Sequence, residues 1–265
     1  MIAEWIRIAE TQGFFGENAE AKVCQDLILK AISESDLSRN ATIKGGVVMR
    51  SLSHSARRAT LDLDVDFIRY SIANDSIDSF IQSLNCLEGV HFERKGPIEE
   101  LRHQDYHGKR VILRIVDKEG EALTCKLDLG VHKDLTLEQE FFCFEVACYD
   151  GTARLLINSK EQMVAEKTKA LLRFGPRSTR FKDVFDLYFL LPLCEPTALD
   201  RCIAKIIFDD PSMREKDFLS LSKRIQVAFQ DKTFLRRLMG SEKNWIGLPT
   251  EDVLSWIVDF FQERV

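Results

Sequence analysis

The spacing of hydrophobic residues changes along the chain, from mixed helix-like and strand-like patterns before about residue 155 to helix-like patterns alone after it. Hydrophobic residues recur every three to four positions over 16–35, as on one face of an amphipathic helix, and they alternate with polar residues over 60–70, as in a half-buried strand. The first part is predicted to contain helices over 16–35, 47–52 and 75–87, and strands over 41–44, 60–70, 109–117, 121–131 and 140–149.

The second part reads as helical throughout, with proline residues between several of the segments. The predicted helices cover 159–174, 180–191, 197–208, 215–229, 232–239 and 250–263. We therefore predict an α+β fold with an α/β domain over 1–155 and a helical domain over 156–265.

Composition narrows the class of protein. The chain has 265 residues, 45% hydrophobic and 30% charged, which is typical of a globular protein with a substantial core. No run of about 18 apolar residues occurs, and acidic residues stand where a signal peptide needs basic ones, so we expect a cytoplasmic protein with no membrane partner. Seven cysteines without a CxxC pair favour neither a disulfide framework nor a zinc ribbon. The net charge of −5 argues against a generally basic surface, and we expect no DNA partner.

The stretch LDLDVDF carries the first candidate chemistry. In a strand, Asp62, Asp64 and Asp66 share one face because side chains alternate with period two. Neighbouring carboxylates on that face are then roughly 6 to 7 Å apart, a spacing that suits cation binding. Like charges held this way need a positive partner, and Mg²⁺ held by carboxylates and substrate phosphates is a common one. The alternative is a surface strand with its polar face in water.

Two further features accompany the acidic strand. Gly45 and Gly46 stand at a predicted strand-to-helix junction, where missing side chains let phosphate oxygens approach backbone N–H groups. A plain tight turn explains the pair equally well. In TCKLDLGVH, Asp128 would complete a carboxylate cluster if its strand neighbours the acidic one; otherwise it is an edge-strand aspartate.

Two charged residues fall on apolar faces of predicted helices. Lys167 lies within the stripe of Met163, Leu171 and Phe174, where it either extends to solvent or reaches a phosphate. Asp183 shares the apolar side of the next helix, and Asp186 lies near the edge of that side.

Basic residues gather around these positions. Between Lys167 and Asp183 the sequence contains no acidic residue, and three arginines stand close to the glycines. The basic residues are Lys169, Arg173, Arg177, Arg180 and Lys182, joined by Arg50, Arg57 and Arg58. This clustering favours a polyanion such as a nucleoside triphosphate or RNA, although basic helices are often solvated faces.

Four motifs follow one another between Ile43 and Leu191: KGG with a following basic residue, RxTxDLDxDF, AEKxxALL and RxKDxFDLYFL. In this order and at these distances the sequence resembles the nucleotidyltransferase-like toxins of the abortive-infection AbiEii/AbiGii type, which include the MenT-type mycobacterial enzymes. The resemblance implies a polymerase-β-like nucleotidyltransferase core with a helical C-terminal part, a nucleoside triphosphate substrate, and Mg²⁺ or Mn²⁺. It also implies an RNA acceptor, the 3′ end of tRNA, with arrest of translation and control by a cognate antitoxin protein.

Carried over by motif, the resemblance implies roles for single residues. Gly45 and Gly46 would hold the triphosphate. Asp62 and Asp64 would hold metal ions, and Lys167 would contact phosphates.

Three more residues complete the expected site. Asp183 is the expected late carboxylate, and Arg50 is a further expected contact to the nucleotide. Asp128 would ligate a metal ion or take the proton of the attacking hydroxyl. Either Asp128 or Asp66 would occupy the third acidic position, which varies in the family.

The chemistry implied is in-line attack of a hydroxyl on the α-phosphorus, with metal ions stabilising the entering and departing oxygens. Two other classes of protein remain open. A metal-dependent phosphohydrolase would also use clustered aspartates but often adds histidine ligands, and His103 and His107 sit in a turn-like segment. A non-catalytic RNA-binding or partner-binding module would need the basic residues but neither Asp62 nor Asp64.

Overall fold

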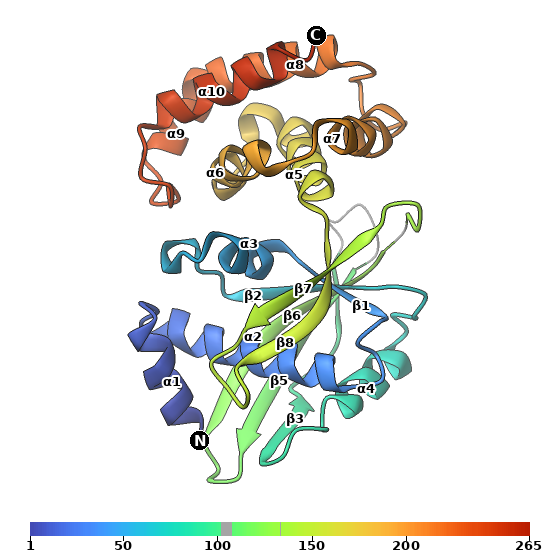
Figure 1. The fold of residues 1–265 in the computed structure, drawn as a ribbon, viewed down its shortest axis with the longest axis vertical. Coiled ribbons are helices and arrows are strands. Elements are labelled where there is room, and N and C mark those ends of the chain that lie inside the picture. The colour runs from blue at the N-terminus through green and yellow to red at the C-terminus, as the bar shows by residue number, and fades with distance from the viewer. Residues whose placement is uncertain (102–107, 133) are drawn as a thin grey trace. The chain divides into compact units, whose positions relative to one another are not determined.

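A computed structural model describes residues 1–101, 108–132 and 134–265. The chain divides into two compact units, Met1–Asn158 and Ser159–Val265. Figure 1 traces both units by residue number. The boundary expected near residue 155 lies inside the last strand of the first unit, β8 (Thr152–Asn158).

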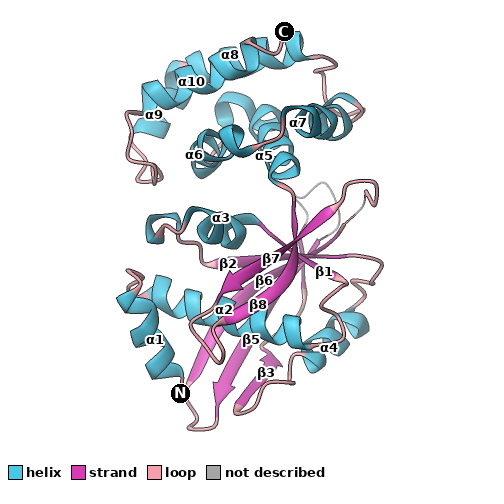
Figure 2. Cartoon of the chain, viewed as in Figure 1, coloured by secondary structure: helices cyan, strands magenta, loops and turns pink. Residues whose placement is uncertain are grey.

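The first unit is a mixed sheet with helices, as predicted for an α+β fold (Figure 2). Its helices are α1 (Ile2–Thr11), α2 (Glu17–Glu34), α3 (Gly45–Ser53) and α4 (Asn74–Ser83). Its strands are β1 (Ala41–Lys44), β2 (Asp62–Phe67), β3 (Val90–Arg94), β4 (Glu99–Leu101), β5 (Gly108–Asp117), β6 (Ala122–Val131), β7 (Gln139–Glu145) and β8. The strand order is β3-β5-β6-β2-β1-β8-β7, and β4 pairs with β5.

The acidic strand β2 lies inside this sheet. It pairs antiparallel with β1 and parallel with β6. Leu63, Val65 and Phe67 are fully buried on one face, and α2 packs against β6 and β8, which flank the pair β2 and β1 in the sheet. Because side chains alternate, the aspartates of β2 project from the opposite face.

The second unit is helical throughout its described length, as predicted. Its α-helices are α5 (Lys160–Phe174), α6 (Phe181–Leu190), α7 (Pro196–Ile203), α8 (Phe218–Gln230), α9 (Lys232–Met239) and α10 (Thr250–Gln262). Helix α5 begins where its capping signal predicts, because the Ser159 hydroxyl accepts a hydrogen bond from the Gln162 N–H at 3.1 Å. The core of this unit includes the fully buried Phe185, Phe234 and Phe261.

Four elements were not predicted: α1, β3, β4 and β8. Strand β8 does alternate, with Ala153, Leu155 and Ile157 buried. However, Leu156 interrupts the polar face and makes the seven residues ambiguous between strand and helix. The segment that contains His103 and His107 lies outside the described residues.

Candidate active site

Strand β2 presents the predicted row of carboxylates. Asp62 and Asp64 are partly exposed, whereas Asp66 is 4% exposed. The three residues differ in their neighbours, since Lys44 Nζ on β1 lies 2.8 Å from Asp66 Oδ2. Within the described part of the chain, Asp62 and Asp64 have no such ion-pair partner.

Asp128 meets the condition set by the sequence, because its strand β6 is the parallel neighbour of β2. In that pairing Asp128 stands opposite Asp64. On its other side lies Arg110 of β5, which binds both carboxylate oxygens of Asp128, at 2.7 Å from Nε and 2.8 Å from Nη2. A bidentate pair of this kind is strong and directional, so Arg110 holds Asp128 in a defined orientation.

The pKa of Asp64 is raised in these surroundings. Burial and the Asp128 carboxylate raise the pKa of Asp64 to about 6, with smaller contributions from Asp62 and Asp66 in the same direction and an opposing one from Lys44. Asp64 and Asp128 thus form a pair of neighbouring carboxylates. A divalent cation bound to it would lower the pKa of Asp64 again.

Close packing against Asp64 and Thr60 requires glycine at positions 45 and 46. Gly45 starts α3 with φ +66°, and a Cβ built on it would lie 2.1 Å from Asp64 Oδ2. A Cβ on Gly46 would lie 2.6 Å from the side chain of Thr60. Both distances are below any normal contact, so residues larger than glycine would displace Asp64 or Thr60. The expected binding of phosphate oxygens at this helix start stays a prediction.

Arg50 has different surroundings from those expected. Its side chain is 5% exposed, with Nη2 3.4 Å from Asp26 Oδ1, and it donates a hydrogen bond to Gln25 Oε1. Gln25 in turn donates to the backbone oxygens of Thr60 at 2.9 Å and of Asp62 at 3.4 Å. Arg50 thus supports the backbone that leads into β2 from inside the first unit.

In the second unit, Lys167 is paired with two aspartates of α6. Its Nζ lies 2.8 Å from Asp183 Oδ1 and 2.7 Å from Asp186 Oδ2. Asp186 is fully buried and also accepts a hydrogen bond from Trp245 Nε1 at 3.0 Å. The sequence indicated Lys167 and Asp183 as unusual residues on apolar faces, and the structure brings them together with a second carboxylate.

Several of these pairings were not predicted. Arg110 falls on the polar face of an alternating strand, and the sequence places Asp186 near the edge of the apolar side of its helix, one turn after Asp183, without assigning it a partner. No local sequence signal connects Trp245 with Asp186, or Lys44 with Asp66, because each pair is joined only by the fold.

A second acidic group lies elsewhere in the first unit. Oxygens of Asp117, Glu119 and Glu121 approach within 4.8 Å of one another. Although burial raises the pKa of Asp117, hydrogen bonds from Ile2 and other backbone N–H groups lower it to about 2. These carboxylates are therefore already satisfied by N–H donors. None of the histidines in the described ranges belongs to such a group of three, which gives no support to a histidine-containing metal site.

The comparison with protein families decides the class. The family model described as nucleotidyl transferase AbiEii toxin, type IV TA system, matches residues 27–247, which is most of the chain. The chain belongs to the AbiEii family. This confirms the resemblance found in the sequence motifs, and the matched range contains the aspartates of β2, Asp128 and the Lys167 cluster. No curated protein matches the chain.

Membership of the AbiEii family makes this chain a nucleotidyl transferase toxin of a toxin–antitoxin system. The described helices include none with the length and apolar character needed to cross a bilayer.

Proposed function

We propose that this AbiEii protein transfers a nucleotide from a nucleoside triphosphate to RNA, at the 3′ end of tRNA, and so blocks translation in the cytoplasm under the control of a cognate antitoxin. The observation that carries the proposal is the pair Asp62 and Asp64, two carboxylates without an ion-pair partner among the described residues, next to Asp128. The start of α3 adjoins them through the contact of Gly45 with Asp64.

A divalent cation fits these residues. The donors are carboxylate oxygens, which Mg²⁺ and Mn²⁺ prefer. Burial and the neighbouring Asp128 carboxylate raise the pKa of Asp64, and a bound cation would relieve the repulsion between the two carboxylates. Asp62 and Asp64 would hold the metal, and Asp128 would join them from the neighbouring strand. When bound, the metal ions would stabilise charge on the entering and departing oxygens of the phosphoryl centre.

The chain's own residues would supply positioning. Backbone N–H groups at the start of α3 point outward from a helix N-terminus and suit phosphate oxygens. Arg110 fixes the orientation of Asp128. Gln25 and Arg50 hold the backbone before and at Asp62. The expected contact of Lys167 with phosphates stays a prediction, and Arg50 has no place as a nucleotide ligand in this proposal because it is buried against Asp26.

The test is incorporation of label into RNA. The purified protein is incubated with total tRNA, Mg²⁺ and each α-labelled nucleoside triphosphate in turn. Label in RNA with the wild type, reduced at least about 100-fold in Asp64→Asn, would support the proposal. Asp75→Asn is the matched control, since Asp75 is an exposed aspartate of the same unit and should retain full activity. Equal labelling by the wild type and Asp64→Asn would show that the β2 carboxylates are not the catalytic site. Nucleotide binding without labelled RNA would exclude the RNA acceptor.

A further inference from the structure

Several arginines of the second unit lie near the C-terminal end of α5, where the aromatic ring of Phe174 is exposed. Helix α5 ends in Arg173 and Phe174 and is followed by the short 3₁₀ turn Gly175–Arg177, against which α8 and α9 both pack. We call this surface the arginine patch, and its members are Arg173, Phe174, Arg177, Arg180, Arg224 and Arg237.

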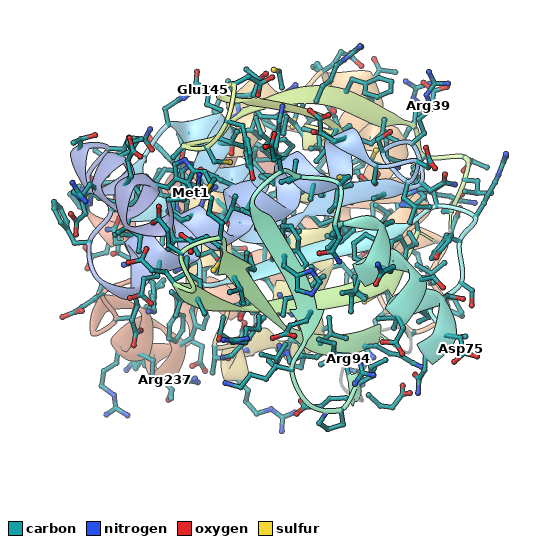
Figure 3. The ribbon with its side chains drawn as sticks, turned by 90° about the horizontal axis from the view of Figure 1, so that it is seen from below. Met1, Arg39, Asp75, Arg94, Glu145 and Arg237 are labelled. Atoms are coloured by element: carbon teal, nitrogen blue, oxygen red, sulfur yellow. The ribbon has the colours of Figure 1, made fainter. Side chains whose placement is uncertain are left out.

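One contact places Arg224 of α8 at this turn, and another places Arg237 of α9 at the start of α6. Arg224 Nη2 lies 3.3 Å from the position that a Cβ on Gly175 would take, so its guanidinium lies directly over the turn. The guanidinium of Arg237 lies 5.5 Å from the ring centre of Phe181, the first residue of α6. Arg237 projects from α9 (Figure 3). The sequence alone indicated a basic cluster from α5 to α6, and the fold adds these two residues to it.

Among the residues that the structure describes, Arg180 and Arg224 each have a carboxylate neighbour only at a long distance. Arg180 Nη1 lies 3.6 Å from Asp183 Oδ2, and its side chain is 56% exposed. Arg224 Nε lies 3.8 Å from Glu215 Oε1, and its side chain is 40% exposed. Both distances are long for ion pairs, so these guanidinium groups keep donors for a further anion. Lys167 behaves differently, because it is held by two close carboxylates.

Phe174 lies between Arg173 and Gly175 in the chain, Arg224 approaches Gly175, and 47% of the surface of Phe174 is exposed. An exposed ring next to guanidinium groups matches the two needs of single-stranded nucleic acid, a stacking surface for a base and planar donors for phosphates. An acidic protein segment would use the charges but not the ring. We infer that the arginine patch binds the acceptor RNA, with a base on Phe174 and phosphates on the arginines; this inference rests on the proposed RNA acceptor.

Binding of 5′-labelled bulk tRNA, measured by fluorescence anisotropy over a series of salt concentrations, separates the two kinds of contact. Arg224→Ala and Arg237→Ala should each weaken binding several-fold at low salt and reduce the slope of log K against log salt by about 0.7 to 0.9, because one phosphate contact is lost. Phe174→Ala should weaken binding about tenfold with the slope unchanged, because stacking releases no counterion.

Arg201→Ala is the matched control. Arg201 is an exposed arginine of α7, which lies away from α9 within the same unit (Figure 1), so its removal changes the net charge equally. The control should keep the affinity and slope of the wild type, and thermal unfolding should show that all variants are folded. Equal effects of Arg201→Ala and Arg224→Ala, or no effect of the patch variants on tRNA, would overturn the inference. If the patch variants lose only the binding of an acidic antitoxin, the occupant is a protein and the inference is wrong.

The outcome is distinguishable from failure of the proposed function. If the wild-type protein binds tRNA through the patch but labels no RNA, the inference holds and the proposed transfer reaction is wrong. If folded patch variants bind and label RNA as well as the wild type, the transfer reaction holds and the inference is wrong.

Discussion

Asp64 and Asp128 stand opposite each other on the parallel strands β2 and β6. Neighbouring strands are about 4.8 Å apart, so this pairing puts two carboxylates next to each other on one face of the sheet. Arg110 binds Asp128, and burial together with the Asp128 carboxylate raises the pKa of Asp64 to about 6. A pair of like charges at this position destabilises the folded chain unless a cation or a proton joins it.

The first prediction concerns stability and pH. Burial and Asp128 raise the pKa of Asp64 from 3.8 to about 6, so the folded chain keeps this proton up to about pH 6 and the unfolded chain loses it near pH 4. The stabilisation from this group is complete below pH 4 and is lost as pH rises to 6, by up to about 3 kcal/mol. With chelator present, Asp64→Asn should therefore gain that amount relative to wild type between pH 4 and 7, measured by denaturant unfolding.

Asp75→Asn serves as the control for this comparison, because the residue is exposed and its difference from wild type should not change over the same pH range. Adding Mg²⁺ at pH 7.5 should raise the Tm of the wild type and leave that of Asp64→Asn unchanged, since a ligand that binds the folded state stabilises it. A constant difference between Asp64→Asn and wild type across pH would contradict the raised pKa.

The second prediction concerns Gly45. Alanine there would combine φ +66° with a Cβ 2.1 Å from Asp64 Oδ2, so Gly45→Ala should lower the free energy of unfolding by about 2 to 4 kcal/mol and abolish activity. Gly16→Ala is the matched control: φ is +54°, and nothing lies within 4 Å of its Cβ, so only about 1 kcal/mol of strain is expected. Chemical denaturation measures both. Equal losses would show that backbone strain, and not Asp64, makes glycine necessary.

The third prediction concerns the contribution of Lys167 to stability. Removing this cation leaves Asp183 and Asp186 facing each other beside Trp245, so Lys167→Met should lower the free energy of unfolding by about 3 kcal/mol. Lys160→Met, at the opposite end of α5, should change it by less than about 0.5 kcal/mol. Denaturant unfolding gives both values. Wild-type stability in Lys167→Met would mean that the two aspartates are held by other groups.

The fourth prediction concerns Arg50, which the sequence assigned to the nucleotide. In the structure its removal leaves Asp26 with Lys22 and the Ala147 N–H, so Arg50→Met should cost about 3 kcal/mol of unfolding free energy. The KM for the nucleoside triphosphate should stay within about twofold of wild type, because the side chain is buried. The exposed Arg39→Met is the control for stability. A stable variant with a strongly raised KM would restore Arg50 as a nucleotide ligand.

Periodicity was sufficient for most of the fold. The alternation of LDLDVDF predicted β2, and the Ser159–Gln162 spacing predicted the start of α5, because both signals are local. The same holds for the helical character of the second unit. Strand β8 was missed because a run of apolar residues conceals its period, and its role depends on pairing with β1 and β7.

The sequence indicated candidate residues for the site but not how they pair. Sequence patterns indicated Asp128, Lys167 and Asp183 as unusual, since charged residues interrupt apolar faces there. Which cation meets which carboxylate depends on sheet register and helix packing between segments far apart in sequence. Arg50 illustrates the limit, because its position beside the glycines suggested a ligand, whereas the packing of α2 turns it towards Gln25 and Asp26.

The three aspartates of β2 are identical in the sequence and unlike in the sheet. Asp66 is the counter-ion of Lys44, Asp64 is the neighbour of Asp128, and the backbone oxygen of Asp62 is held by Gln25. The heptapeptide LDLDVDF would therefore not reproduce this site in another sheet. It would supply three carboxylates there, but none of the neighbouring groups that make the three different from one another.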